Sequence, residues 1–187
     1  MSEARSQPTT EVHVRDIAPA DVPRVWEMLR GLATYEKLTD ILTGNPEMLH
    51  DALFDPRAER LYGLVAERHG RLVGYALYYP IFGSFRTRWR LYLEDLFVEP
   101  EARGSGAGIA LMAELARRVQ EGGYYSLDWE VIDWNTPSIE FYERLGSKRI
   151  ATDWLRYRLD GETLDAMAKR ATARAARAPS ASPGPRT

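Results

Sequence analysis

Four residues with an evident chemical use stand close together just past the middle of the chain. Arg103 is followed by Gly104, Gly106 and Gly108, three glycines at alternate positions, and then by a run with helical periodicity. The start of a helix presents unpaired N–H groups and a partial positive charge, and glycines leave those groups unobstructed. Such a loop can hold a phosphate or pyrophosphate, with Arg103 as a cation at its mouth.

Two familiar phosphate loops do not fit this spacing. A P-loop requires Lys and then Ser or Thr after its last glycine, but Ile109 and Ala110 stand there. A dinucleotide-binding fingerprint requires its third glycine where Ile109 lies. The remaining pattern is Arg-x-x-Gly-x-Gly, formed by Arg103, Gly106 and Gly108, and it resembles the acetyl-CoA loop of the GNAT N-acetyltransferase superfamily. Glycines alone can also serve a turn, so this interpretation depends on the flanking motifs.

A second motif strengthens the resemblance. The segment from Asn135 to Gly146, Asn-Thr-Pro-Ser-Ile-Glu-Phe-Tyr-Glu-Arg-Leu-Gly, is similar to the second acetyl-CoA signature of the same superfamily. With the strand motif Tyr-Leu-Glu-Asp (92–95) and the turn Asp-Trp-Asn (133–135), the chain resembles the diamine (spermidine/spermine) acetyltransferase group, which includes enzymes acting on thialysine and related amines. The resemblance spans roughly residues 12–168. It implies acetyl-CoA as co-substrate, a sheet splayed between two parallel strands, and a homodimer.

The resemblance assigns acetyl-CoA binding to backbone and side-chain groups of both motifs. These residues are Leu96, Phe97, Val98, Arg103, Gly104, Ser105, Gly106, Ala107, Gly108, Ile109, Asn135, Pro137, Ser138 and Tyr142. Asn135 is first of all a helix cap, and a contact with CoA is compatible with that role. No metal is expected.

Amine acetylation needs a base, because a protonated amine must lose a proton before it attacks a thioester. Glu94 matches the family's proposed base, and Tyr142 matches its general acid, which protonates the departing thiolate. The alternatives are a solvated strand carboxylate at 94 and a core tyrosine at 142. Side chains alternate along a strand, so we expect Asp95 to face away from Glu94. The chain has no cysteine, so a thiol acyl-enzyme is excluded and direct transfer within a ternary complex is favoured.

Acidic and aromatic residues are expected to bind the acceptor amine. The resemblance points to Tyr35, Glu36, Glu94, Asp128, Trp129, Glu130 and Asp153. The chain departs from the group after Pro80, where an Asp-Pro-Trp is absent and Arg86, Arg88 and Arg90 stand nearby. If these arginines line the pocket, they favour a substrate that carries a carboxylate over a polyamine. The other interpretation is a solvated strand edge, where arginines only discourage aggregation.

The expected function is acetyl-CoA-dependent N-acetylation of the primary amine of a small molecule: a diamine, a polyamine, or a lysine- or thialysine-like amino acid. Two alternatives stay open, acetylation of a protein N-terminus or lysine, and a catalytically silent CoA-binding dimer. The scattered histidines His13, His50 and His69 are interpreted as surface residues, neither catalysts nor ligands.

The elements that must position these residues include both strand and helix patterns. Period-two or apolar runs predict strands at 11–17, 61–67, 72–79, 89–98, 124–132, 148–150 and 155–159. Helical periodicity and capping residues predict helices at about 21–36, 45–55, 105–120 and 136–145, with an Ala-rich helical segment after 162. This order predicts an α/β domain with a mixed, mostly antiparallel central sheet flanked by helices; the splay between two parallel strands comes from the resemblance.

Composition bounds the remaining possibilities. A length of 187 residues and a hydrophobic content of 44% favour one domain with a sizeable core, placed at 11–170 between a flexible stretch at 1–10 and a disordered tail at 171–187. The net charge of −2 gives no electrostatic case for nucleic acid, and no apolar run approaches the length of a membrane span. The absence of cysteine excludes disulfides and thiolate metal sites. Because the first residues lack a secretory pattern, we expect a cytoplasmic protein.

Overall fold

The computed structural model describes residues 11–58, 61–150 and 157–177. The chain divides into two compact units, Met1–Ser138 and Ile139–Thr187. The larger unit carries the sheet, both motif loops and most of the residues expected in the site. The prediction of a single domain at 11–170 stays a prediction.

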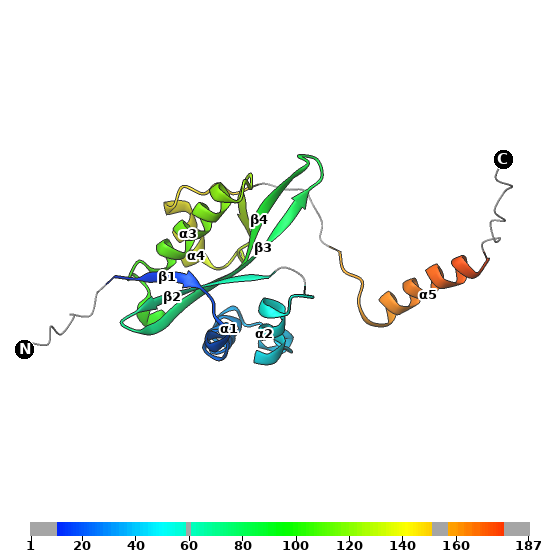
Figure 1. Cartoon of the computed structure of the whole chain (residues 1–187), viewed down its shortest axis with the longest axis horizontal. Helices are drawn as coiled ribbons and strands as arrows, with labels where there is room; N and C mark the ends of the chain where they lie inside the picture. The colour runs from blue at the N-terminus through cyan, green and yellow to red at the C-terminus, as the bar shows by residue number, and fades with distance from the viewer. Residues whose placement is uncertain (1–10, 59–60, 151–156, 178–187) are drawn as a thin grey trace, which may run out of the picture. The chain divides into compact units, whose positions relative to one another are not determined.

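The sheet of the larger unit is mixed and mostly antiparallel, as predicted. In the part of the chain that the structure describes it has five strands in the order β1-β2-β3-β4-β5 (Figure 1). The strands are β1 (His13–Asp16), β2 (Tyr62–Arg68), β3 (Arg71–Gly83), β4 (Arg88–Val98) and β5 (Leu127–Trp129). Neighbours from β1 to β4 pair antiparallel, whereas β4 and β5 pair parallel.

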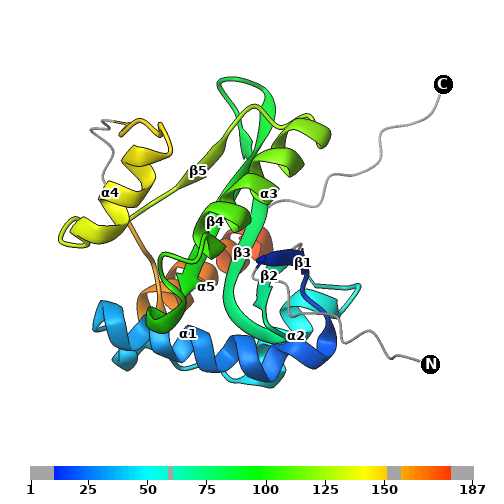
Figure 2. The same cartoon turned by 90° about the vertical axis from the view of Figure 1, so that its left-hand side faces the viewer.

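Two helices cover one face of this sheet. Figures 1 and 2 show α1 (Val22–Glu36) and α2 (Pro46–Phe54) together on one side. Their apolar positions repeat at helical spacing, so they bury a single stripe. That stripe packs against the side chains that β2, β3 and β4 present on the same side. The resulting core comprises Ile17, Val22, Val25, Met28, Leu49, Val65, Tyr75, Leu77 and Phe97.

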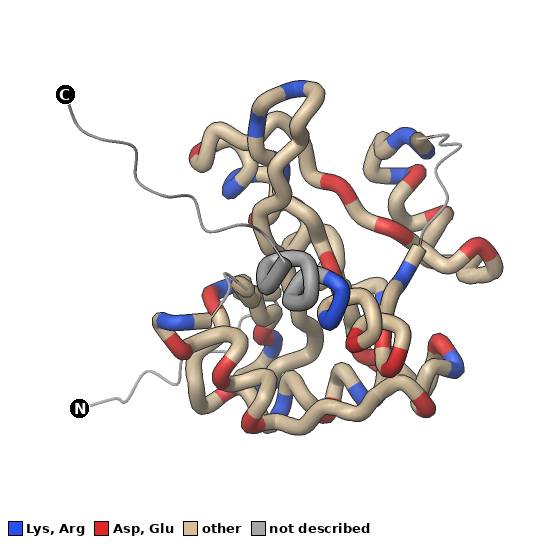
Figure 3. Tube along the Cα trace, turned by 90° about the vertical axis from the view of Figure 1, so that its right-hand side faces the viewer, with Lys and Arg blue, Asp and Glu red and all other residues tan. Residues whose placement is uncertain are grey.

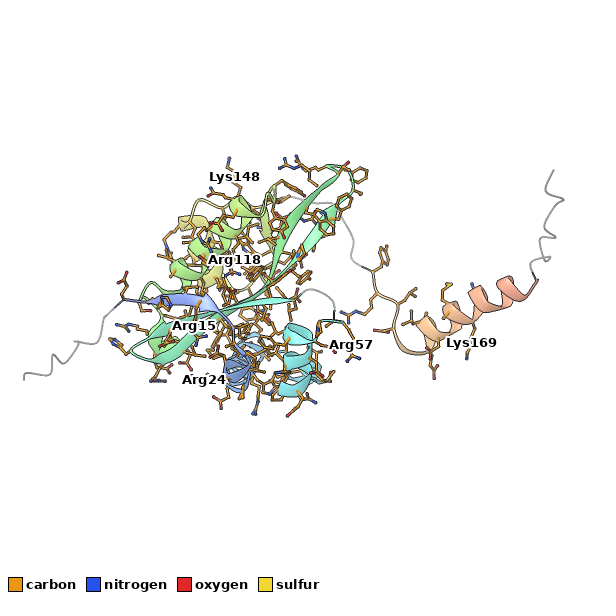
Figure 4. The ribbon with its side chains drawn as sticks, in the orientation of Figure 1. Arg15, Arg24, Arg57, Arg118, Lys148 and Lys169 are labelled. Atoms are coloured by element: carbon orange, nitrogen blue, oxygen red, sulfur yellow. The ribbon has the colours of Figure 1, made fainter. Side chains whose placement is uncertain are left out.

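A third helix covers the opposite face. Helix α3 (Ala107–Glu121) buries Ala107, Leu111, Met112 and Leu115. Its Arg118, labelled in Figure 4, donates a hydrogen bond to the Tyr78 hydroxyl and pairs with Asp16 at 2.8 Å. Because Tyr78 alternates with Tyr75 and Leu77 along β3, this contact places α3 on the side away from α1. Basic and acidic residues are interspersed along the trace (Figure 3).

Strand β4 contains a bulge at Glu94. The register with β3 runs Leu77 opposite Asp95 and then Tyr78 opposite Leu93, so Glu94 has no Cα partner. An extra residue of this kind breaks the alternation of side chains and increases the local twist. Pairing between β4 and β5 is recorded from Leu91 to Leu93, so it ends immediately before the bulge. The two parallel strands therefore separate at the extra residue.

The end of the chain differs from expectation. The smaller unit has α5 (Gly161–Arg177), and α4 (Thr136–Arg144) begins in the larger unit and ends in the smaller one. Strands were expected at 148–150 and 155–159, but residues 148–150 and 157–159 form none, and residues 155–156 lie outside the described part of the chain. Such short runs specify a strand weakly, because a strand needs a neighbour for its backbone groups. Helix α5 also extends through 171–177, inside the range expected to be a disordered tail, because Ala and Arg favour helix strongly.

Gly74 on β3 offers a test of how tightly the sheet is built. A Cβ atom at this position would stand 2.8 Å from the Phe97 carbonyl oxygen and 3.2 Å from Val98 Cγ2. Gly74→Ala should therefore push β3 away from β4 and lower the free energy of unfolding by about 1–3 kcal/mol, the range seen for overpacked sites. Urea unfolding followed by circular dichroism measures this loss. Unchanged stability would mean that β4 moves aside without cost.

Candidate active site

Carboxylates gather on the α1 face of the sheet, around the bulge. Tyr79 follows Tyr75 and Leu77 at alternate positions on β3, so its side chain emerges on the α1 face. Its hydroxyl donates a hydrogen bond to Glu94 Oε2 at 2.9 Å. Burial and this carboxylate, with a contribution from Glu130, raise the pKa of Tyr79. The Tyr79 hydroxyl therefore keeps its proton, and its hydrogen bond orients the exposed side chain of Glu94.

Asp95 lies on this same face, so the expectation that it faces away from Glu94 is wrong. The ring of Phe97 packs against Tyr75 with centroids 6.2 Å apart, which puts Phe97 on the α1 face, and Asp95 precedes it by two residues. The bulge is the reason, because it turns two successive acids to one side. Burial, and then the charges of Glu94 and Glu36, raise the pKa of Asp95 to about 7.

Glu36, the last residue of α1, is the third acid of the group formed with Glu94 and Asp95 on the α1 face of the sheet. It is partly buried, and this burial raises its pKa. The Tyr75 hydroxyl is fully buried without a hydrogen-bond partner among the described residues. Burial, followed by the charges of Asp95 and Glu36, raises the pKa of Tyr75 well above its usual value. A cluster with this much negative potential attracts a cationic amine and can accept a proton from it.

A basic side chain lies further along the same face. Arg90 precedes Tyr92 by two residues, and Asp128 on β5 is in register with Tyr92, so all three share a side. Arg90 Nε lies 3.0 Å from Asp128 Oδ2, and Arg90 Nη1 donates to the Tyr125 hydroxyl at 3.1 Å. One of the acids predicted to bind an amine is therefore already paired with an arginine.

The glycine loop has the backbone that its sequence predicts. Gly104 and Gly106 adopt φ values of 78° and 90°, which other residues rarely tolerate, and no atom lies within 4 Å of a Cβ built at either. Helix α3 begins at Ala107, directly after Gly106. Its first N–H groups precede any intrahelical bond and are available to an anion. The open space and the free donors fit the diphosphate of acetyl-CoA.

Tyr35 joins the glycine loop to the second motif. The Arg103 guanidinium lies over the Tyr35 ring at 5.2 Å, and the Tyr35 hydroxyl donates to Asn135 Oδ1 at 2.9 Å. Asn135 is buried and accepts a further hydrogen bond from Ser138 N at 3.3 Å, so it caps α4 as predicted. Both motifs that resemble acetyl-CoA signatures thus meet at the end of α1. This role of Tyr35 was not expected from the sequence, which placed it among the substrate-binding residues.

Other expected residues are only partly located. Tyr142 lies in the smaller unit, where its carbonyl accepts a hydrogen bond from Ser147 Oγ at 2.7 Å. Trp129 is in register with Leu93 rather than Tyr92, so it faces the side opposite Asp128. Asp153 lies outside the described residues. The roles given to these three residues stay predictions.

Sequence reasoning missed the tyrosines of β3 and the pairing of Arg90. The only available signal for Tyr79 was its place on the strand before the Glu-Asp pair, and using it required knowledge of the bulge. Among the described residues, no group of three or more His, Cys, Asp and Glu side chains is arranged to hold a metal. In the same part of the chain no helix is long and apolar enough to cross a membrane.

Comparison with solved structures shows the same fold elsewhere. An integron cassette protein from Vibrio cholerae superposes with a TM-score of 0.66 at 25% identity, covering 84% of this chain and 98% of that one. An aminoglycoside acetyltransferase from a soil metagenome superposes with a TM-score of 0.66 at 17% identity, covering 80% of this chain and 97% of that one. The second similarity concerns the fold alone.

Sequence relatives extend over nearly the whole described region. A thialysine N-epsilon-acetyltransferase from Sus scrofa is 31% identical over 166 residues, covering 84% of this chain and 97% of the relative. An L-ornithine N5-acetyltransferase from Arabidopsis thaliana is 24% identical over 200 residues, covering 83% and 87%. The profile described as "Acetyltransferase (GNAT) family" matches residues 26–147, a segment that contains the glycine loop, the acids and Asn135. The chain therefore belongs to the GNAT family of acetyl-CoA-dependent N-acetyltransferases.

Proposed function

We propose that this enzyme acetylates the primary amine of a small molecule, a diamine, a polyamine, or a lysine- or thialysine-like amino acid, by direct transfer within a ternary complex. The observation that carries this proposal is the bulge on β4. It places the Tyr79–Glu94 pair and Asp95 where β4 and β5 separate, and the glycine loop follows at the end of the same strand. This arrangement supports a proposed amine site and a proposed thioester site adjacent to each other along one strand.

The residues present fit acetyl-CoA. Arg103 and the N–H groups at the start of α3 would take the diphosphate, with Gly104, Ser105, Gly106, Ala107, Gly108 and Ile109 forming the loop. The backbone of Leu96, Phe97 and Val98, past the last recorded β4–β5 pair, would hold the pantetheine amides as a strand edge holds a peptide. Asn135, Pro137 and Ser138 would complete the second side. Acetyl-CoA supplies the acetyl thioester and leaves as CoA.

Glu94 is assigned the proton of the attacking amine. An ammonium that enters the acidic cluster gives its proton to Glu94, directly or through water, and the freed nitrogen then attacks the acetyl carbonyl. The Tyr79 hydroxyl keeps Glu94 oriented, and Asp95 can share the proton because its pKa lies at about 7. Tyr142 is assigned the proton delivered to the sulfur as the C–S bond breaks. The chain has no cysteine to form an acyl-enzyme, which supports direct transfer.

Two further expectations belong to the same proposal. The enzyme is expected to be a cytoplasmic homodimer, and the exposed aromatic side chains Phe82, Phe85, Trp89 and Trp134 offer apolar surface for a partner. Protein acetylation is the less favoured alternative, because short loops leave little length for a peptide-binding extension. A silent CoA-binding dimer is disfavoured by the oriented Glu94.

CoA release from acetyl-CoA should depend on a primary amine. The measurement is thiol release with a panel of small primary amines, a peptide with a free N-terminus and a lysine-containing peptide, with CoA affinity determined in parallel by calorimetry. Small amines should give turnover well above the peptides. If the peptides were the better acceptors, or if CoA bound with no turnover for any amine, the proposed function would be wrong.

The glycine loop should fail when a side chain is introduced. Gly106→Val should lower acetyl-CoA affinity strongly, because its φ of 90° excludes a branched residue and the loop must change shape. Gly70→Val is the matched control: Gly70 also has positive φ, 71°, but lies in the β2–β3 turn. Calorimetry should show weak binding in the first variant and near-normal binding in the second. Equal affinities in two folded variants would contradict the loop assignment.

Tyr142→Phe should lower turnover and leave acetyl-CoA binding nearly intact, since only the proton donor is removed. General acids contribute roughly 10²–10⁴-fold, so a loss within or somewhat below that range is expected. Product release can mask chemistry, and a single-turnover measurement avoids this. A wild-type rate in that measurement would make Tyr142 structural.

A further inference from the structure

Arg90 is an unusual neighbour for a site that binds amines. It shares the α1 face with Tyr92, next to the acids at the bulge, and it is the partner of Asp128. A site for a polyamine gains from a series of acids that meet successive ammonium groups, whereas a fixed arginine repels them. The charge pattern along this face is therefore acidic near Glu94 and dipolar near Arg90 and Asp128.

We propose that Arg90 and Asp128 bind the α-amino acid end of the acceptor, the guanidinium taking the carboxylate and Asp128 the α-ammonium. The substrate class is then a basic amino acid whose side-chain amine is acetylated at Glu94. This inference rests on the proposed function and narrows it.

The guanidinium is held in place before any ligand arrives. Arg90 is only partly exposed, its Nε lies 3.0 Å from Asp128 Oδ2 in an ion pair without an aligned hydrogen bond, and its Nη1 donates to the Tyr125 hydroxyl at 3.1 Å. Arg86 lies over the same tyrosine ring at 5.4 Å, a cation–π contact. These contacts occupy only part of the guanidinium's N–H groups, and the remainder can take a carboxylate. Pre-ordering lowers the entropy lost on binding and makes an arginine fork selective for planar anions.

The zwitterionic end of an amino acid complements this ion pair. Its carboxylate is attracted to Arg90 and its α-ammonium to Asp128, so both charges of the ligand find partners. The second ammonium of a diamine finds Asp128 but also meets Arg90. Discrimination should then come from the carboxylate, which only Arg90 recognises.

The spacing along β4 suits a lysine-like chain. Arg90 and Glu94 are four positions apart, which corresponds to roughly 13 Å between Cα atoms at about 3.3 Å per residue. Both side chains are long and emerge on one face, so their heads can approach each other. In an extended lysine the side-chain nitrogen and the carboxylate are roughly 7 Å apart, given bonds of about 1.5 Å. One molecule can therefore reach both groups.

The competing interpretation is that Arg90 and Asp128 only attach β5 to β4. In that case loss of either side chain would affect all acceptors alike. Substrates that lack one group each separate the two interpretations. Cadaverine is lysine without its carboxylate, and 6-aminohexanoate is lysine without its α-amino group.

The experiment is a comparison of kcat/KM for these three acceptors. The wild-type enzyme should prefer lysine to cadaverine by roughly 10–100-fold, the range for a hydrogen bond between charged groups. Arg90→Gln should remove this preference, lowering kcat/KM for lysine and 6-aminohexanoate while leaving cadaverine unchanged or improved. Asp128→Asn should lower it for lysine and cadaverine more than for 6-aminohexanoate. Arg88→Gln, which removes an exposed arginine at the next position on the same face, should change none of the ratios.

A wild-type enzyme that prefers cadaverine, or does not discriminate, would overturn the inference and leave the proposed function standing. An equal loss of kcat/KM for all three acceptors in Arg90→Gln would also overturn the inference, and would mean that Arg90 only attaches β5 to β4. If a variant did not fold, the wild-type preference alone would decide. Absence of CoA release with every amine of the panel would remove the proposed function as well.

Discussion

The extra residue in β4 is the constraint on which the site depends. A regular strand would send Glu94 and Asp95 to opposite faces, and one of them would lie under α3. Because the register shifts at Glu94, both acids reach the α1 face. There Tyr79 donates a hydrogen bond to Glu94, and burial raises the pKa of Asp95. The same position ends the pairing with β5. A single inserted residue thus produces the acidic cluster and the opening between the parallel strands.

The end of α1 connects this cluster to the two loops proposed to bind the co-substrate. Tyr35 and Glu36 are successive residues, so they point in different directions around the helix axis. Tyr35 contacts Arg103 and Asn135, whereas Glu36 adds its charge to that around Asp95. A movement of α1 would therefore change the geometry of the glycine loop and the electrostatics around Glu94, the proposed base, together. The two halves of the site are mechanically coupled through one helix turn.

Several of these features could be predicted from residue types alone. The turn at Gly104 and Gly106 could be predicted because a left-handed backbone favours glycine. The cap at Asn135 could be predicted because the first position of a helix favours short polar side chains. The shared face of Asp95 and Glu94 was not predictable, since a bulge is set by the pairing of two strands and leaves little trace in either. The strand predicted at 148–150 is absent, and so is the described part, 157–159, of the strand predicted at 155–159, because runs this short do not identify a pairing partner.

Protonation connects the buried acid to the reaction. Asp95 has an ordinary pKa of 3.8 that is raised to about 7 in the folded protein. The folded state therefore binds this proton more tightly than the unfolded chain. As a result, the contribution of Asp95 to the free energy of unfolding increases as the pH falls from about 7 towards 4, and it is least favourable above pH 7. A cationic amine placed among Glu36, Glu94 and Asp95 offsets that repulsion by supplying the missing positive charge. In the proposed reaction, binding of the ammonium would release the proton of Asp95 near neutral pH, and the cluster would become a better acceptor for the proton that the amine must lose.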